Sequence, residues 1–485
     1  MAPSGIFGST TVSKASTGRR THEHFGEPDA QDADTDSLDR DHIARAVEAH
    51  LKCREATNGQ DVVVGVKGSG KTDLRLHVEA SDPDALVVNF SASDIMLNID
   101  ASELPGSSGR GKNVVSAILL TEFAQRAGRQ GKSPAMLKLK GAAERITQMI
   151  KNVPEAAQVD VYGIVKFSPA KLMQTAAKNV VQNATNDLLK DVIDALQDQR
   201  GYILIDDIED VIDNIEEHPL VLESIVRAAH DINHVSKDRL HVLVFIKHGL
   251  WRAWYEEQRE YDKVAHRIAF LEWDRKSLVD LIGRRIATAR GITSALTAEE
   301  LWRKEFEWEG TFESFTYQIT RYSVNGPRDV IALCNAAGVA AGDLDSPIKL
   351  THIEGQLDKY SEQKLVGIHQ DFGVLYPGLA VFVQRVFRNS DATLSAQKLA
   401  SQIEDRVKTD PDAKFEDYSS AEWYRNSTSE RLAMLMYEIG VLGIGEEPNV
   451  RYAIGSRTVS RTEFMSQKQL VVHPAFRRNL GIQAV

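Results

Sequence analysis

Residues 65–72 read GVKGSGKT, so that Gly65 and Gly70 flank four residues and are followed by Lys71 and Thr72. This pattern is typical of a phosphate-binding loop, in which glycines let successive backbone N–H groups turn toward an anion. The lysine can reach the terminal phosphates and the threonine hydroxyl can bind Mg²⁺. The alternative, a structural glycine turn, is disfavoured by the β-branched run before the loop. The residues expected to bind ATP are Gly65, Lys67, Gly68, Ser69, Gly70, Lys71 and Thr72.

A second element must supply acidic groups, and the stretch YILIDD ends in Asp206 and Asp207. We expect Asp206 to lie on a strand neighbouring the loop strand and to bind Mg²⁺ together with Thr72. Asp207 is suited to polarise an attacking water. Glu209 is an alternative base, and an Asp pair that merely caps the following loop is the structural alternative. The pattern thus predicts Mg²⁺-ATP binding and slow hydrolysis to ADP and phosphate.

Two cationic residues could complete the site. Lys247 closes the apolar run VLVFIK, where the carboxyl end of a parallel strand would place it beside a nucleotide. Arg328 follows the Gly-Pro break in NGPRDVIALCN and stands in the first turn of a helix, from which its planar fork could reach phosphate. A solvated strand-end lysine and an ordinary helix-start arginine remain the alternatives.

The elements that must position these residues are strands alternating with helices. Buried, β-branched runs predict strands over about 61–66, 85–92, 201–210 (with an acidic end) and 241–248, and a strand-like stretch at 266–273. Helical patterns lie between them, which favours a doubly wound α/β fold with a parallel sheet in a three-layer core.

The chain divides into four expected parts. Residues 1–39 are polar and read as a disordered tail, and residues 40–275 form the P-loop ATPase core with a helical insertion over about 113–199. Residues 276–390 are all-helical and form a lid. Residues 391–485 show the helix–strand–turn–strand order of a winged helix.

The C-terminal section is basic within an otherwise acidic chain. Its cationic residues are Arg451, Arg457, Arg461, Lys468, Arg477 and Arg478. Duplex phosphate could bind there. The alternative is that the winged helix contacts the ATPase core or a protein partner.

Composition limits the broad class. The 485 residues carry a net charge of −11, which argues against a protein that generally coats nucleic acid. The two cysteines lie far apart and indicate neither a disulfide framework nor a zinc site. No apolar run approaches a membrane span, so we expect a cytoplasmic protein with no membrane partner.

Taken together, the motifs resemble a bacterial P-loop ATPase family of the STAND and origin-recognition-like branch of AAA+ ATPases, often found in phage-defence loci. The resemblance covers about residues 39–482 and includes the stretches ILIDD, VFIKHGLW, FLEWDRKSLVDLIGRRI, GPRDVIALCN and HPAFRRNLGI. It implies nucleotide and Mg²⁺ binding by Lys71 and Thr72, a Walker B role for Asp206 and Asp207, and a second-sensor role for Arg328. The family usually has an arginine where this chain has Lys247.

These features favour a nucleotide-driven switch that forms homo-oligomers and regulates a separate effector protein, with antiviral defence as the expected setting. A DNA-loading ATPase of the initiator type is the alternative, supported by the basic C-terminal section. A small-molecule kinase is a third class, which the lid, the sensor arginine and the winged helix disfavour.

Overall fold

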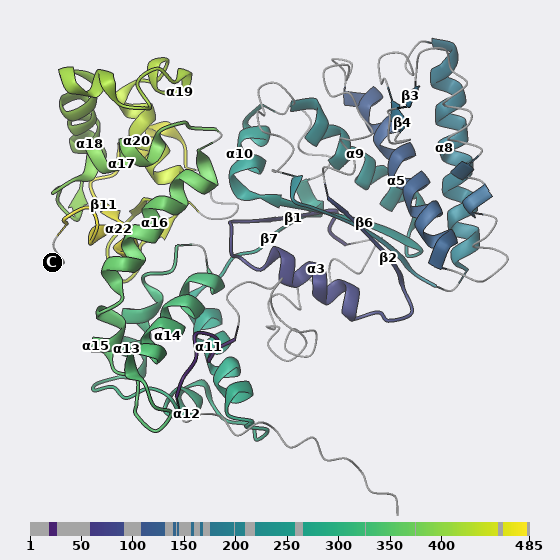
Figure 1. Cartoon of the computed structure of the whole chain (residues 1–485). Helices are drawn as coiled ribbons and strands as arrows, with labels where there is room; N and C mark the ends of the chain where they lie inside the picture. The colour runs from purple at the N-terminus through teal and green to yellow at the C-terminus, as the bar shows by residue number, and fades with distance from the viewer. Residues whose placement is uncertain are drawn as a thin grey trace, which may run out of the picture.

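A computed structural model describes residues 19–26, 59–91, 108–130, 139–141, 143–144, 157–159, 165–167, 175–197, 199–208, 219–257, 265–324, 326–373, 375–453 and 459–482. Figure 1 shows a sheet domain at the right, a helical domain at the lower left and the C-terminal domain above it. None of the described helices is long and apolar enough to cross a membrane.

The sheet domain is built on five parallel strands in the order β2-β5-β6-β1-β7. Their bounds are β1 (Val62–Gly65), β2 (Leu86–Ser91), β5 (Gly201–Asp206), β6 (Leu240–Lys247) and β7 (Ile268–Phe270). Strands β1 and β5 are buried along their whole length, as expected for strands covered on both faces. One expectation is wrong: the strand that ends at Asp206 does not neighbour β1, because β6 lies between them.

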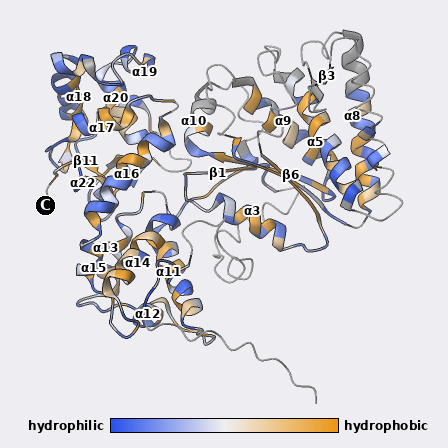
Figure 2. Ribbon diagram, viewed as in Figure 1, coloured by the Kyte–Doolittle hydropathy of each residue, from blue (hydrophilic) through white to orange (hydrophobic). Residues whose placement is uncertain are grey.

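Helices cover both faces of this sheet and give three layers. Helix α3 (Lys71–Ala80) packs on one face through Leu74 and Val78, together with Val63 and Phe245 of the strands. The other face carries α5 (Ser108–Gln130) and α9 (Pro219–Ser236), whose apolar residues share one core cluster with the strands. Hydrophobic residues colour these two helices orange beside the sheet in Figure 2.

The expected insertion over 113–199 is only partly separate from the core. Helix α5 is itself a layer of the sheet domain, since Val114, Ile118 and Phe123 are buried in that cluster. Helix α8 (Thr175–Leu196) packs outside α5, and a short antiparallel pair, β3 (Ala157–Val159) with β4 (Val165–Phe167), was not expected. An amphipathic pattern does not distinguish a helix that covers a sheet from one that is inserted beside it.

The start of β1 carries a buried network of charged groups. Asp61 accepts hydrogen bonds from Arg267 Nε at 2.8 Å and Asn233 Nδ2 at 2.7 Å, and its Oδ2 lies 2.8 Å from His230 Nδ1. Burial raises the pKa of Asp61, but these three bonds outweigh it, and the pKa is lowered overall. Burial also lowers the pKa of the neighbouring His241 to about 4.

Beyond the sheet, α10 (His248–Glu257) follows β6 and the helical domain begins with α11 (Arg275–Ala289). The further helices are α12 (Ala298–Trp302), α13 (Phe312–Thr320), α14 (Pro327–Ala341), α15 (Leu350–Glu354), α16 (Leu357–Phe372) and α17 (Leu379–Phe387). The all-helical character expected after Arg275 therefore holds over the described residues. Trp302 and Phe382 are fully buried in the core that this domain shares with the C-terminal domain.

The C-terminal domain has winged-helix order. Helices α18 (Ala396–Ile403) and α20 (Ser429–Glu438) pack on each other beside a four-stranded sheet in the order β10-β9-β11-β8. The strands are β8 (Thr393–Leu394), β9 (Leu442–Ile444), β10 (Arg451–Tyr452) and β11 (Leu470–Val472). Short helices α19 (Glu422–Arg425), α21 (Arg461–Met465) and α22 (Pro474–Arg477) complete it.

The N-terminal part contains an ordered segment, residues 19–26, within the stretch expected to be a disordered tail. Phe25 is fully buried against the helical domain, and its N–H donates to Asn335 Oδ1 at 2.8 Å. Arg285 donates to the Phe25 carbonyl at 2.8 Å. The expectation of disorder is wrong for this segment, because one buried aromatic and its backbone bonds are too short a signal to form a pattern. The rest of 1–39 lies outside the described residues.

The same segment joins a buried ion cluster around Glu305. Arg20 Nε donates to its carboxylate at 2.9 Å, His24 Nε2 lies 3.0 Å from it, and Arg290 Nε also donates to it. Burial raises the pKa of Glu305, but His24, Arg290 and Arg20 outweigh that effect and bring the pKa to about 2. The segment is therefore held to the helical domain by both apolar contact and charge.

Candidate functional site

The loop between β1 and α3 has a backbone that only glycine adopts easily. Gly68 and Gly70 have φ angles of 78° and 95°, in the left-handed region. A Cβ on Gly65 would lie 2.2 Å from Ser69 Oγ, so a side chain there would collide with the loop itself. Helix α3 begins at Lys71, which directs its first backbone N–H groups to the concave side of the loop. This shape fits a phosphate group.

Two lysines lie at this edge of the sheet. Lys71 Nζ donates to the carbonyl oxygens of Gly65 at 3.0 Å and Val66 at 3.3 Å, which folds the side chain over the loop. Lys247 is the last residue of β6 and stands opposite Gly65 in the parallel register. The structure thus brings Lys247 to the phosphate loop, as its position at a strand end predicts.

The acidic pair lies at the end of β5, two strands from β1. Asp206 is 6% exposed, and its Oδ2 lies 3.3 Å from Arg75 Nε of α3. Because Arg75 follows Thr72 by three residues on the same helix, Asp206 reaches the first turns of α3. The ion pair of Asp206 with Arg75 was not expected from the sequence, although an arginine one turn after Lys71 is a signal that could have suggested it.

Asp207 has a different environment from Asp206. It is half-buried, its φ angle is 56°, and its N–H donates to Asp206 Oδ1 at 3.0 Å. A left-handed backbone is uncommon outside glycine, although aspartate tolerates it better than most residues. The competing base, Glu209, lies outside the described residues.

Arg328 is one of the contacts between the helical domain and the loop. Its N–H donates to the Gly68 carbonyl at 3.4 Å, and a Cβ on Gly68 would meet Arg328 Cβ at 2.9 Å. Helix α14 starts one residue earlier with Pro327 after Gly326, whose φ is 88°. The break predicted from Gly-Pro therefore places Arg328 directly on the phosphate loop.

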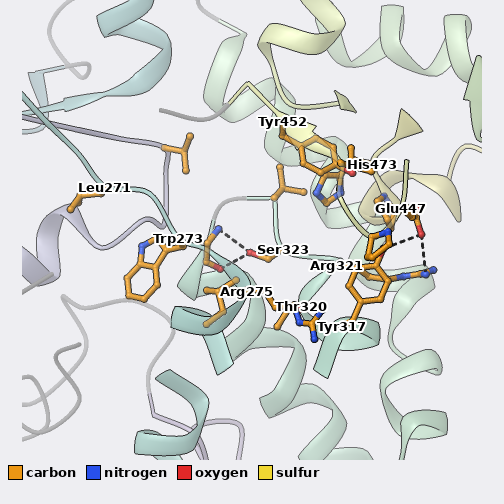
Figure 3. Close-up of a pocket in the computed structure, with 17 residues that line it drawn as sticks. Leu271, Trp273, Arg275, Tyr317, Thr320, Arg321, Ser323, Glu447, Tyr452 and His473 are labelled. Atoms are coloured by element: carbon orange, nitrogen blue, oxygen red, sulfur yellow. Dashed lines mark hydrogen bonds and ion pairs between the residues drawn. The ribbon is translucent and has the colours of Figure 1, made fainter. Parts of the chain in front are cut away.

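Sequence reasoning missed Trp273, which follows β7. Its indole Nε1 donates to the Ser69 carbonyl at 2.8 Å, and its ring lines a cavity of about 210 Å³. Figure 3 shows that the other walls come from the helical domain (Arg275, Tyr317, Arg321) and the C-terminal domain (Glu447, Tyr452, His473). A single tryptophan in a linker has no pattern to reveal it. The cavity marks the place where all three domains meet beside the loop.

Glu447 links the two walls of this cavity that come from the helical domain and the C-terminal domain. Its carboxylate accepts hydrogen bonds from Tyr317 at 3.2 Å, from Arg321 at 3.4 Å and from Arg477. Burial raises the pKa of Glu447, but Arg477, Arg321 and Tyr317 lower it overall. The loop between β9 and β10 is therefore fastened to the helical domain.

Three of the six cations named in the C-terminal section form ion pairs with carboxylates of the same chain. Arg477 bonds Glu447, Arg461 pairs with Glu430, and Arg478 lies 3.9 Å from Asp358. Of the other cations named above, Arg451 and Lys468 are exposed, and Arg457 lies outside the described residues.

Helix α20, which stands at the position of a winged-helix recognition helix, is docked on the sheet domain. Glu438 at its end accepts from Arg252 of α10 at 2.8 Å and from Arg431 at 2.7 Å. Glu438 is 8% exposed, so this ion pair is largely shielded from water. The contact ties the C-terminal domain to the sheet domain.

Comparison with known proteins gave structural similarity only. No protein-family model matches the chain, and no curated protein matches it in sequence. Among solved structures, it is similar to the Aeropyrum pernix ORC2 protein in ADPNP and ADP complexes, with 13% identity, a TM-score of 0.38 and coverage of 87% of this chain and 92% of that one.

Two further structures give similar values. One is the Aeropyrum pernix ORC1 protein in complex with DNA, with 12% identity, a TM-score of 0.36 and coverage of 96% and 98%. The other is Cdc6p of Pyrobaculum aerophilum, with 10% identity, a TM-score of 0.29 and coverage of 90% and 91%. These superpositions are loose, so the description of the fold rests on its own sheet order, phosphate loop and C-terminal domain.

Proposed function

We propose that this chain binds Mg²⁺-ATP at the loop of residues 65–72 and hydrolyses it slowly, and that the bound nucleotide sets how its three domains sit together. The observation that carries the proposal is the contact of Arg328 with Gly68. A phosphate held by the loop would lie at a junction of two domains, so its presence or loss would act on both. The glycine-dependent loop shape supports the anion part of the proposal.

Each residue then has a defined task. The N–H groups of Lys67, Gly68, Ser69, Gly70, Lys71 and Thr72 surround the phosphates, and the Lys71 ammonium neutralises their charge. The Thr72 hydroxyl and Asp206 would hold Mg²⁺, which neutralises further charge when bound. The contact with Arg75 turns the Asp206 carboxylate toward α3.

Asp207 orients and polarises the attacking water in this proposal, with Glu209 as its rival. Lys247 and Arg328 face the terminal phosphate and stabilise the charge that develops there. Because lysine cannot form the bidentate contact of arginine, Lys247 serves its own loop rather than that of a neighbouring subunit.

A turnover assay tests these assignments. We expect Asp207→Asn to keep ATP binding and to lower turnover by about 10²–10⁴-fold, the usual effect of losing a general base. Asp191→Asn, an exposed carboxylate on α8, is the matched control and should leave turnover unchanged. If Glu209→Gln stops turnover and Asp207→Asn does not, the base is Glu209.

As a switch, the chain should respond to nucleotide by self-association and by regulating a separate effector protein, with antiviral defence as the proposed setting. The docking of α20 through Glu438 and Arg252 supports this form, since a C-terminal domain held on the core moves when the core moves. Light scattering should show larger particles with a non-hydrolysable ATP analogue than with ADP. A monomer in every nucleotide state, with no effector co-purifying, would count against it.

The DNA-loading alternative depends on Arg451, Lys468 and other exposed cations of the C-terminal section. Binding of a DNA duplex should then weaken steeply with salt, in proportion to the number of phosphates contacted. Tight, salt-sensitive binding that the double variant Arg451→Ala, Lys468→Ala removes would favour this alternative over the effector-regulating switch.

A further inference from the structure

The last turn of α16 lies against the nucleotide edge of the sheet. Lys67 Nζ of the phosphate loop donates to Gln370 Oε1 at 3.3 Å and lies 3.4 Å from Asp371 Oδ1. The next residue, Phe372, covers the start of α10, since a Cβ on Gly249 would meet its ring at 3.2 Å. Three consecutive residues of the helical domain thus contact the edge where ATP is proposed to bind.

Asp371 is the unusual member of this contact. Its side chain is 16% exposed and lies 3.4 Å from Lys67 Nζ of the loop, and the charges of Lys247 on β6 and Lys364 on its own helix also act to lower its pKa. Burial raises the pKa of Asp371, and the three lysines do not compensate fully, so the pKa stays above its usual value. This carboxylate has no part in the hydrolysis described above.

Two of these three lysines lie at the proposed phosphate site. Lys67 belongs to the phosphate loop, and Lys247 stands opposite Gly65 in register. A carboxylate and a phosphate near the same cations repel each other and compete for the same charge. ADP lacks the phosphate that would take part in this competition.

We propose that Asp371 sets the discrimination between ATP and ADP: the γ-phosphate displaces its carboxylate from Lys67, and triphosphate binding thereby releases the end of α16 from the loop. This inference rests on the proposed binding of ATP. It adds a specificity-determining residue outside the phosphate-loop and acidic motifs.

The release would be felt by the other domains because α16 connects them. Lys364 of this helix bonds Asp329, next to Arg328, and the Ser361 hydroxyl accepts a hydrogen bond from Asn479 N–H at 3.0 Å. The helix also packs on α22 of the C-terminal domain. Movement of its last turn therefore bears on both the sensor arginine and the winged helix.

Parallel titrations of the full chain with ATPγS and ADP test the proposal. We expect Asp371→Asn to bind ATPγS about tenfold more tightly than the wild-type chain, because the carboxylate that repels the γ-phosphate is removed. ADP affinity should change less than about twofold. Gln370→Ala is the matched control: it removes the neutral contact with the same Lys67 and should leave the ratio of the two affinities unchanged.

Hydrogen exchange gives a second readout that does not depend on affinity. In the wild-type chain, ATPγS should speed exchange of the amides at residues 368–372 relative to ADP, and the difference should shrink in Asp371→Asn. An ATPγS-to-ADP affinity ratio that is the same in Asp371→Asn and wild type overturns the inference while leaving the proposed function standing. If the wild-type chain binds neither nucleotide, the proposed function fails and this inference fails with it.

Discussion

The two ends of β1 hold acidic groups in opposite conditions. At its start, Asp61 is enclosed by His230, Asn233 and Arg267, and its pKa is lowered. At its other end, Lys67 of the loop after β1 contacts Asp371, whose pKa is raised by burial although Lys67, Lys247 and Lys364 act to lower it. Both carboxylates are largely buried and lie beside the same strand.

The difference separates a charge that is compensated within the fold from one that we propose to act in binding. At Asp61 both oxygens accept good hydrogen bonds, so the charge is compensated and the network fixes where β1, β7 and α9 meet. At the loop end Asp371 contacts Lys67 at 3.4 Å, and Lys67 and Lys247 are the cations proposed to meet an anion. The first end should therefore control stability, and the second should control binding.

The largest expected effect is at the start of the strand. Asp61→Ala leaves Arg267 buried without its carboxylate, and we expect the free energy of unfolding to fall by about 3–5 kcal/mol. Denaturant unfolding measures this free energy, with Asp187→Ala, at an exposed position of α8, as the control. Equal stability of Asp61→Ala and wild type would contradict the claim that the Asp61 network stabilises the fold.

The next effect is at the loop end. Lys71→Ala removes the ammonium that faces the phosphates, and ATP affinity should fall at least about a hundredfold, equivalent to about 2.7 kcal/mol. Its melting temperature should stay near that of the wild type, because the loop lies at the edge of the sheet. Lys276→Ala, an exposed lysine on α11, controls for charge. Unchanged ATP affinity in Lys71→Ala would refute the phosphate-loop assignment.

The pH dependence of stability tests the start of β1 separately. His241 is buried as the neutral imidazole with a pKa of about 4, whereas an unfolded chain binds the proton near pH 6.5. The unfolded state therefore binds more protons between these values, and stability should fall by about 1–3 kcal/mol as the pH drops from 6.5 to 4.

Urea unfolding at a series of pH values measures this slope. In His241→Asn the slope should become shallower over that range, while His266→Asn, at an exposed position, should keep the wild-type slope. If His241→Asn and wild type lose stability in parallel, burial of the imidazole is not the cause.

The smallest expected effect concerns the hydrogen bond from Trp273 to the loop between β1 and α3. Trp273→Phe removes one donor to the Ser69 carbonyl, worth about 1 kcal/mol, so ATP affinity should fall about fivefold. Trp308→Phe is the matched control, because its Nε1 is buried with no hydrogen-bond partner among the described residues. An equal change in both variants would show that ring size matters rather than the bond.

The sequence predicted the features that depend on local order. The apolar runs locate the five strands, and the Gly-Pro break before Arg328 places that residue at the start of α14, because caps and β-branched runs act within a few residues. The conformation of the loop follows from its glycines in the same way.

What the sequence did not reveal arises from contacts over long separations. Asp371 lies 304 positions after Lys67, and Glu438 lies 186 after Arg252. Neither pair leaves a periodic signal, since an isolated acid on a helix is usually a solvated one. The placement of α5 against the sheet was missed because its apolar face would look the same against any partner.

The segment of residues 19–26 has a consequence for how copies of this chain could exchange parts. Phe25 and the cluster at Glu305 make it an intramolecular ligand of the helical domain, joined to the sheet domain by the 32 residues between Gly26 and Gly59. Because the segment belongs to the same chain, its binding is intramolecular, so a weak intrinsic affinity is enough to keep it bound. A chain that lacks its first 26 residues should therefore accept the segment as a free peptide, or from a second copy at high concentration, as a domain-swapped arm.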